Sequence, residues 1–455
     1  MTATERSGSL AHWNEPVDAA GLALFRIAFG VLMLGAVVRF VSYGWVNELY
    51  LAPSFHFTYL GFDWVKPWPG SALYFHFGLM GVAALGIATG AYTRLSAFVF
   101  FVTFTYAELL DKATYLNHYY LVSLLALLLC FLPSSAALSV DAWRRRRRGD
   151  EGPACVGRWV YLLLRAQIGL VYFFAGFAKL NADWLFSAEP LRTWLPVHAD
   201  LPLVGPALAE PALAYAMSWA GAAFDLSVGP LLLFRKTRLW AYLAAASFHV
   251  LVWLLFPIGV FSWVMIVSGT IFFEPDWPRR FLGRFLAPLG QGSSRPLRPS
   301  SAALVAGYLA LQVLVPLRFV LYPGNPNWTE EAFRFAWRVM LIEKSGSVEY
   351  RVVTSEGERL LRPRDGLTPL QEKMLSTQPD MIHEYALELA RRERARTGAP
   401  VEVYADAWAA LNGRPSQRLI DPSVDLSAEP RSLATKSWII PLEAAPSRER
   451  RSDLR

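Results

Sequence analysis

The stretch Arg165-Ala-Gln-Ile-Gly-Leu-Val-Tyr-Phe-Phe-Ala-Gly-Phe-Ala-Lys179-Leu-Asn-Ala-Asp183-Trp184 is predicted to be an apolar helix that stops at a lysine and leaves through an Asn-x-Asp-Trp turn. A lysine at the end of a membrane helix is ordinary where its ammonium group reaches the lipid headgroups. In a dry pocket, loss of hydration instead favours the neutral amine, which can act as a base. The stretch alone leaves both interpretations of Lys179 open.

The composition indicates a polytopic membrane protein. Of the 455 residues, 54% are hydrophobic and 18% are charged, whereas soluble domains carry about 25% charged residues. The net charge of +7 comes from basic residues in short loops between apolar runs, as membrane topology requires, so we expect no nucleic-acid partner. Cys130 and Cys155 define no disulfide framework. The sequence contains no metal-ligand cluster and no glycine-rich phosphate loop, so we expect no metal.

Nine apolar runs approach the length of about 20 residues that crosses a membrane as a helix. They are Ala20–Val41, Ala72–Gly90, Leu95–Leu110, Tyr119–Leu138, Trp159–Phe177, Ala214–Phe234, Leu239–Phe256, Gly259–Phe273 and Ala302–Leu321. We therefore predict a polytopic α-helical membrane protein of about nine transmembrane helices, formed by residues 1–321.

Residues 322–455 are predicted to form a C-terminal extracytoplasmic α+β domain that caps the outer face. Ser347–Thr354 and Glu358–Leu361 flank a Ser-Glu-Gly turn and have the pattern of a hairpin. Thr368–Ser376 and Pro379–Thr397 have helical patterns, and Val401–Ala410 has that of a strand.

The lysine and arginine bias predicts the orientation. Basic residues concentrate at Arg94, Arg144–Arg148, Arg235–Arg238 and Arg279–Arg298, which places these loops in the cytoplasm. The N-terminus is then inside and the tail after Leu321 is outside. No cleavable signal peptide is expected, and a bacterial inner membrane is the favoured location.

With this topology, polar residues gather on the predicted outer side. Asn117 and His118 precede one span, Lys179 follows another, and His249 lies in the outer half of a third. Ionisable residues at membrane depth are functional candidates, although a packed core histidine is the plainer interpretation of His249. Phe333 and Trp337 follow the last span and matter only if they cover a pocket for an aromatic ligand.

Two further charged residues lie inside spans. Arg165 is placed near the inner end of its helix, where we expect it to pair with a carboxylate. Asp225 is deep and needs a partner, and a hydrogen bond between packed helices is its favoured role.

Several blocks of the chain resemble the vitamin K-dependent gamma-carboxylase family, whose membrane part is an HTTM-type module shared with a wider bacterial group. The blocks are Leu110-Asp-Lys with Asn117-His118-Tyr-Tyr-Leu, Ser139-Val-Asp141, Arg165-x-Gln167 through Lys179-Leu-x-Ala-Asp-Trp184, Phe248-His249, Phe256-x-Ile-Gly-x-Phe-Ser262, Pro275-x-Trp-Pro-Arg-Arg280, Asn327-Trp-Thr329 and Arg418-x-Ile-Asp-Pro-x-Val-Asp425. They span roughly residues 20 to 440, nearly the whole chain.

The resemblance implies an enzyme that oxidises vitamin K hydroquinone with O2 to the epoxide. This oxidation is coupled to removal of a glutamate γ-proton and addition of CO2. The family's catalytic base maps onto Lys179 and its active-site histidine onto His118. Asn117, His249, Phe333 and Trp337 are then expected to bind the quinol. Asp183 and Arg165 are expected to have positioning roles.

The implied partners are a glutamate-containing peptide or protein, the lipid membrane and a quinone reductase. The sequence also departs from the animal enzymes. Their larger lumenal extension is not expected here, and Phe333 stands where animal members have tyrosine. Two alternatives therefore stay open: a quinol epoxidase or oxidase of the same fold without protein carboxylation, and a non-catalytic lipid-binding membrane protein.

Overall fold

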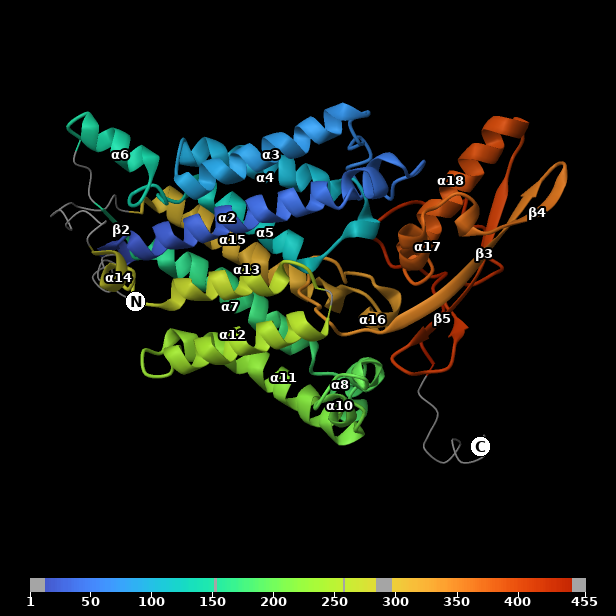
Figure 1. Cartoon of the computed structure of the whole chain (residues 1–455). Coiled ribbons are helices and arrows are strands. Elements are labelled where there is room, and N and C mark those ends of the chain that lie inside the picture. The colour runs from blue at the N-terminus through green and yellow to red at the C-terminus, as the bar shows by residue number, and fades with distance from the viewer. Residues whose placement is uncertain (1–12, 151–153, 257, 284–296, 444–455) are drawn as a thin grey trace.

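Long apolar helices run side by side through most of the chain, and a small β-sheet with two helices lies at one end of them (Figure 1). This computed structural model describes residues 13–150, 154–256, 258–283 and 297–443. The helices of the bundle are α2 (Ala20–Ser42), α3 (Ser71–Thr89), α4 (Thr93–Leu109), α5 (Asn117–Phe131), α7 (Trp159–Ala178), α11 (Pro211–Leu233), α12 (Arg238–Leu255), α13 (Phe261–Gly269) and α15 (Pro299–Leu317).

Each predicted apolar run overlaps one of these helices, but the count of nine spans is not confirmed. Six helices of the described chain are long and apolar enough to cross a membrane: α2, α3, α7, α11, α12 and α15 with its 3-10 extension to Leu321. The helix α5 stops at Phe131 because Leu132 takes an extended conformation before Pro133. The helix α13 has only 9 residues before a 3-10 turn, η4 (Thr270–Phe272).

Short elements connect the bundle helices. Strands β1 (Pro16–Asp18) and β2 (Cys155–Gly157) pair antiparallel, which ties the N-terminal segment to the start of α7. The other connections are η1 (Asn47–Leu51), η2 (Lys112–Thr114), α6 (Val140–Arg147), α8 (Ala182–Ser187), α9 (Leu191–Trp194), η3 (Leu195–His198), α10 (Gly205–Leu208), α14 (Arg279–Leu282), η6 (Arg318–Leu321) and α16 (Pro326–Thr329).

The C-terminal region is an antiparallel sheet in the order β4-β3-β5-β6, covered by helices. Its elements are β3 (Lys344–Thr354), β4 (Gly357–Leu361), η7 (Pro363–Asp365), α17 (Pro369–Leu375), α18 (Pro379–Thr397), β5 (Glu402–Leu411) and β6 (Gln417–Arg418). The predicted hairpin, the two helices and the third strand are confirmed. Every second residue of β5 from Val403 to Leu411 is buried, because α18 packs on that face.

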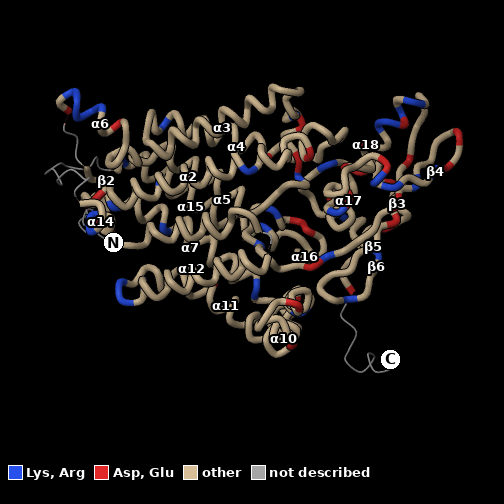
Figure 2. Tube along the Cα trace, in the orientation of Figure 1, with Lys and Arg blue, Asp and Glu red and all other residues tan. Residues whose placement is uncertain are grey.

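The charges divide between the two ends of the bundle (Figure 2). Lysines and arginines cluster at α6, at α14 and at the turn between α11 and α12, away from the sheet, whereas both signs mix at the sheet end. This separation is the one that the positive-inside rule requires. Part of the basic segment Arg279–Arg298 lies outside the described residues.

Candidate active site

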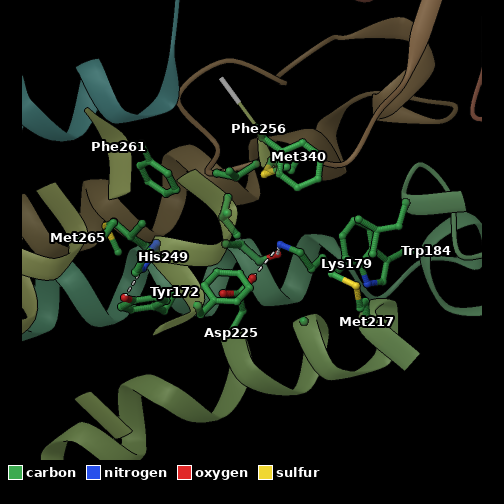
Figure 3. Close-up of a pocket in the computed structure, with 17 residues that line it drawn as sticks. Tyr172, Lys179, Trp184, Met217, Asp225, His249, Phe256, Phe261, Met265 and Met340 are labelled. Atoms are coloured by element: carbon green, nitrogen blue, oxygen red, sulfur yellow. Dashed lines mark hydrogen bonds and ion pairs between the residues drawn. The ribbon is translucent and has the colours of Figure 1, made fainter. Parts of the chain in front are cut away.

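A cavity of about 90 Å³ lies among α7, α11, α12 and α13, several times the ~10–15 Å³ that one water molecule needs. Its charged and hydrogen-bonding side chains are Tyr172, Lys179, Asp225 and His249, together with the indole of Trp184 (Figure 3). The remaining lining is glycine, aliphatic, aromatic or methionine. Such a cavity suits a flat apolar ligand that carries a few polar atoms.

Lys179, the residue that ends α7, is buried in this cavity with a carboxylate partner. Its side chain is 7% exposed, and its Nζ donates to Oδ2 of Asp225 at 2.7 Å. The ammonium also lies 5.1 Å from the ring centre of Trp184. Lys179 therefore does not extend toward lipid headgroups. Its partner is a carboxylate from another helix, which neither interpretation of the lysine had included.

Gly176 explains how Asp225 reaches Lys179 from another helix. A Cβ atom at position 176 would lie 2.8 Å from Cγ of Leu226, 2.9 Å from the Leu226 nitrogen and 3.0 Å from Cβ of Asp225. Only glycine allows α7 and α11 to approach this closely. The close approach places the carboxylate of Asp225 beside the end of α7.

His249 and Tyr172 form a second polar pair in the cavity. The Tyr172 hydroxyl and Nε2 of His249 are 2.8 Å apart, and Oγ of Ser262 donates to the His249 carbonyl at 2.6 Å. Nδ1 of His249 is buried without a hydrogen-bond partner among the described residues. A buried polar atom without a hydrogen-bond partner is uncommon. An atom of a bound ligand would form the hydrogen bond that Nδ1 lacks.

The structure does not bring His118 and Asn117 into the lining of this cavity. The Phe261 ring lies against both histidines, with ring centres 5.7 Å from His118 and 5.6 Å from His249. His118 is buried behind this phenylalanine. Asn117 faces the C-terminal region instead, where its Nδ2 donates to the Arg338 carbonyl at 3.1 Å.

Phe333 and Trp337 also lie outside the cavity. The Trp337 ring stacks on Tyr120 of α5 at 5.0 Å. The segment that carries these aromatics is not a strand, because Glu330, Ala332, Phe335, Trp337 and Met340 all have left-handed φ angles of 53–62°. This irregular backbone instead directs Val339 and Met340 into the cavity.

Phe333 lines a second, charged cavity at the junction of the bundle and the C-terminal region. Its cations are Lys112, Arg318, Arg334, Arg431 and Lys436, and its carboxylates are Glu330, Glu331 and Asp380. Burial raises the pKa of the Asp380 carboxyl, but the charges of Arg334 and Lys112 outweigh burial and hold this pKa below its ordinary value.

The two expected positioning residues have different surroundings. Asp183 accepts from Arg414 at 2.5 and 2.8 Å and from Nδ2 of Asn412 at 3.0 Å, so it joins the exit of α7 to the C-terminal region. Arg165 lies roughly 20 Å from Lys179 along α7, by the rise of 1.5 Å per residue. Its guanidinium donates to the carbonyls of Ile271 and Phe273, where the sequence had predicted a carboxylate.

Sequence reasoning missed Tyr172 and undervalued Asp225. A carboxylate in the middle of an apolar span needs a cation, and Lys179 was already a candidate at the end of another span. Combining these two facts would have predicted the pair. Tyr172 gives no comparable signal, because a tyrosine within an aromatic helix is ordinarily packing. Among the described residues, no group of three or more His, Cys, Asp or Glu side chains is placed to hold a metal ion.

Two family models match the chain. The HTTM domain matches residues 14–277, which is more than half of the chain. The lumenal domain of vitamin K-dependent gamma-carboxylase matches residues 298–445. No solved structure matches. The candidate cavity lies between helices of the first match and takes Val339 and Met340 from the second.

Proposed function

This chain belongs to the vitamin K-dependent gamma-carboxylase family, and from that membership we propose that it is an integral-membrane gamma-glutamyl carboxylase. The proposed reaction oxidises vitamin K hydroquinone with O2 to the epoxide. It is coupled to removal of a glutamate γ-proton and addition of CO2 to a peptide. The observation that carries the proposal is the apolar cavity that contains the buried Lys179–Asp225 pair and the incompletely bonded His249.

The residues present suit a hydroquinone. The lining is mostly apolar, and Nδ1 of His249 offers an unfilled hydrogen bond to a ring oxygen. When bound, the hydroquinone would supply the electrons that reduce O2, and its oxygenation would generate a base strong enough for the glutamate γ-proton, which no side chain can remove near neutral pH. Lys179, His249 and the aromatic lining would hold it, while Asn117, Phe333 and Trp337 remain predictions from the family resemblance.

In the proposed mechanism Lys179 acts in its neutral amine form and accepts a proton from a ring hydroxyl. The Asp225 carboxylate at 2.7 Å stabilises the ammonium that this transfer forms, as a buried carboxylate does for the histidine of a catalytic triad. The surrounding apolar side chains exclude water and strengthen this electrostatic effect. His118 remains the active-site histidine predicted from the family resemblance, although its ring contacts Phe261 and does not line the cavity.

We further propose that residues 1–321 form the membrane domain and residues 322–455 an extracytoplasmic cap. On this arrangement the active site faces the extracytoplasmic side of a bacterial inner membrane. The glutamate-containing peptide reaches it from that side, and a quinone reductase regenerates the hydroquinone.

Two variants of the full-length protein test the chemical assignment, with epoxide measured by chromatography and γ-carboxyglutamate by mass spectrometry. Lys179→Ala should lower epoxide formation by about 10²–10⁴-fold, the range for a lost acid–base group, and Asp225→Asn should also lower it. Lys66→Ala is the matched control, because Lys66 is exposed, and it should retain turnover. Unchanged epoxide formation in folded Lys179→Ala protein would exclude Lys179 as the base.

A second candidate function is quinol oxidation without protein carboxylation. One observation favours it: the C-terminal region contributes only the apolar Val339 and Met340 to the described cavity, and neither binds a carboxylate. Epoxide formation without γ-carboxyglutamate across many glutamate-rich peptides would support this function. A protein that neither turns over nor binds quinone would instead be a lipid-binding membrane protein.

A further inference from the structure

The cavity has two polar ends along the axis of one helix. Tyr172 lies on α7 and Lys179 directly follows its last residue, about two turns or ~10 Å further along the axis, and both line the cavity. Each has a partner from another helix, His249 of α12 and Asp225 of α11 (Figure 3). The lining near these pairs is apolar, including Val171, Ala175 and Phe248.

The Tyr172–His249 pair leaves one hydrogen bond unmade. A neutral imidazole has one donor nitrogen and one acceptor nitrogen. Nε2 is engaged by Tyr172 at 2.8 Å, and Nδ1 is buried without a partner among the described residues. The imidazole is 2% exposed, so bulk water does not supply the missing bond.

The Tyr172 hydroxyl is suited to orienting His249. The tyrosine is 3% exposed, and its ring packs edge-on against Phe224 at 6.1 Å. Among the described residues, the one hydrogen bond of its hydroxyl goes to Nε2 of His249. That bond fixes the orientation of the ring and therefore the direction in which Nδ1 points. Nδ1 is a donor when the tyrosine donates to Nε2, and an acceptor when Nε2 donates to the tyrosine.

We propose that Nδ1 of His249 binds the ring oxygen remote from Lys179, and that Tyr172 is the positioning residue for this contact. The cavity then selects a flat apolar ring that carries two oxygens at opposite ends, one for each polar pair. This inference rests on the proposed function, because it takes the ligand to be a hydroquinone. It adds a positioning residue, Tyr172. It also predicts that the protein distinguishes ligands with a second ring oxygen from ligands without one.

The test compares two probes that differ by one hydroxyl. Anaerobic calorimetry measures binding of 1,4-dihydroxynaphthalene and 1-naphthol to the full-length protein in lipid nanodiscs. Wild-type protein should bind the diol about tenfold more tightly, the factor that corresponds to one hydrogen bond. His249→Leu should remove this preference, and Tyr172→Phe should reduce it. His249→Asn keeps a polar atom close to the Nδ1 position and should recover part of it.

The controls separate a binding role from a structural one. Tyr242→Phe removes the hydroxyl of a tyrosine on α12 that lies outside the cavity, so it should leave the ratio of the two affinities unchanged. An unchanged ratio in both folded His249→Leu and Tyr172→Phe proteins would overturn this proposal and leave the proposed function standing. If wild-type protein binds neither probe, the hydroquinone assignment fails as well.

Discussion

At the scale of single residues, burial makes the charged side chains of the cavity depend on each other. Lys179 and Asp225 are both almost fully buried and contact each other at 2.7 Å. Removal of one member of such a pair leaves an uncompensated charge and typically costs about 3–5 kcal/mol of stability. Loss of activity in a single variant is therefore interpretable only alongside its unfolding temperature.

The buried His383 predicts a pH dependence of stability in the C-terminal region. Burial lowers the pKa of His383 below its ordinary value of 6.5, while its Nε2 hydrogen bond to the Glu429 carbonyl opposes this shift. A depressed pKa means that the unfolded chain binds the proton more readily. The stability that neutral His383 contributes is thus present above pH 6.5 and lost as the pH falls through the folded-state pKa.

The expected loss is at most ~1.4 kcal/mol per pH unit, the limit for one proton. Unfolding temperatures measured from pH 7.5 to 5.5 should fall less steeply in His383→Gln, which can still donate to the Glu429 carbonyl but does not titrate. Parallel pH profiles for the variant and wild-type proteins would show that His383 does not contribute.

At the scale of elements, the packing of α7 against α11 positions the charged pair. The two helices meet at Gly176, where an added Cβ would contact both the side chain and the backbone of Leu226. Gly169 lies on the same helix, but a Cβ there would meet nothing within 4 Å. A methyl group would therefore clash with α11 at position 176 but not at position 169.

We predict that Gly176→Ala separates α7 from α11. Overpacking costs typically about 1–3 kcal/mol, which should lower the unfolding temperature in detergent and weaken quinone binding. Gly169→Ala is the control, since alanine gains the same helix propensity there without a clash, and it should be neutral or stabilising. Equal effects of the two substitutions would contradict the close approach at Gly176.

At the scale of the whole molecule, charged contacts hold the C-terminal region on the bundle. Lys112 pairs with Asp380 at 2.9 Å and with Glu384 at 2.7 Å. Asp183 accepts from Arg414 immediately beyond the end of α7. The Asp183–Arg414 contact connects the C-terminal region to the segment that carries Lys179. The position of the C-terminal region therefore affects the geometry around Lys179.

Arg414→Ala should loosen this junction. Loss of one partner of a desolvated charge pair costs roughly 2–5 kcal/mol, so limited proteolysis between the bundle and the sheet should become several-fold faster and epoxide formation should decrease. Arg418→Ala is the matched control, because the Arg418–Asp406 pair is about half exposed and such pairs contribute little. Equal cleavage rates for the two variants would argue against a role for the Asp183 contact.

The sequence by itself determined the class of the protein and most of its elements. Hydrophobic runs and basic loops predicted the helices, and the two-residue and helical periodicities of residues 347–410 predicted the sheet and its helices, because these signals are local. The ordered motifs also identified the family and selected Lys179, His118 and His249 as candidates.

Only the tertiary structure decided which side chains meet. Asp225 is 46 positions from Lys179, and their contact depends on a glycine that lets two helices touch. Phe261 separates His118 from the cavity, and left-handed turns carry Phe333 and Trp337 elsewhere. The number of membrane spans also depends on where each helix ends. These outcomes arise from packing between segments distant in sequence, which no local pattern encodes.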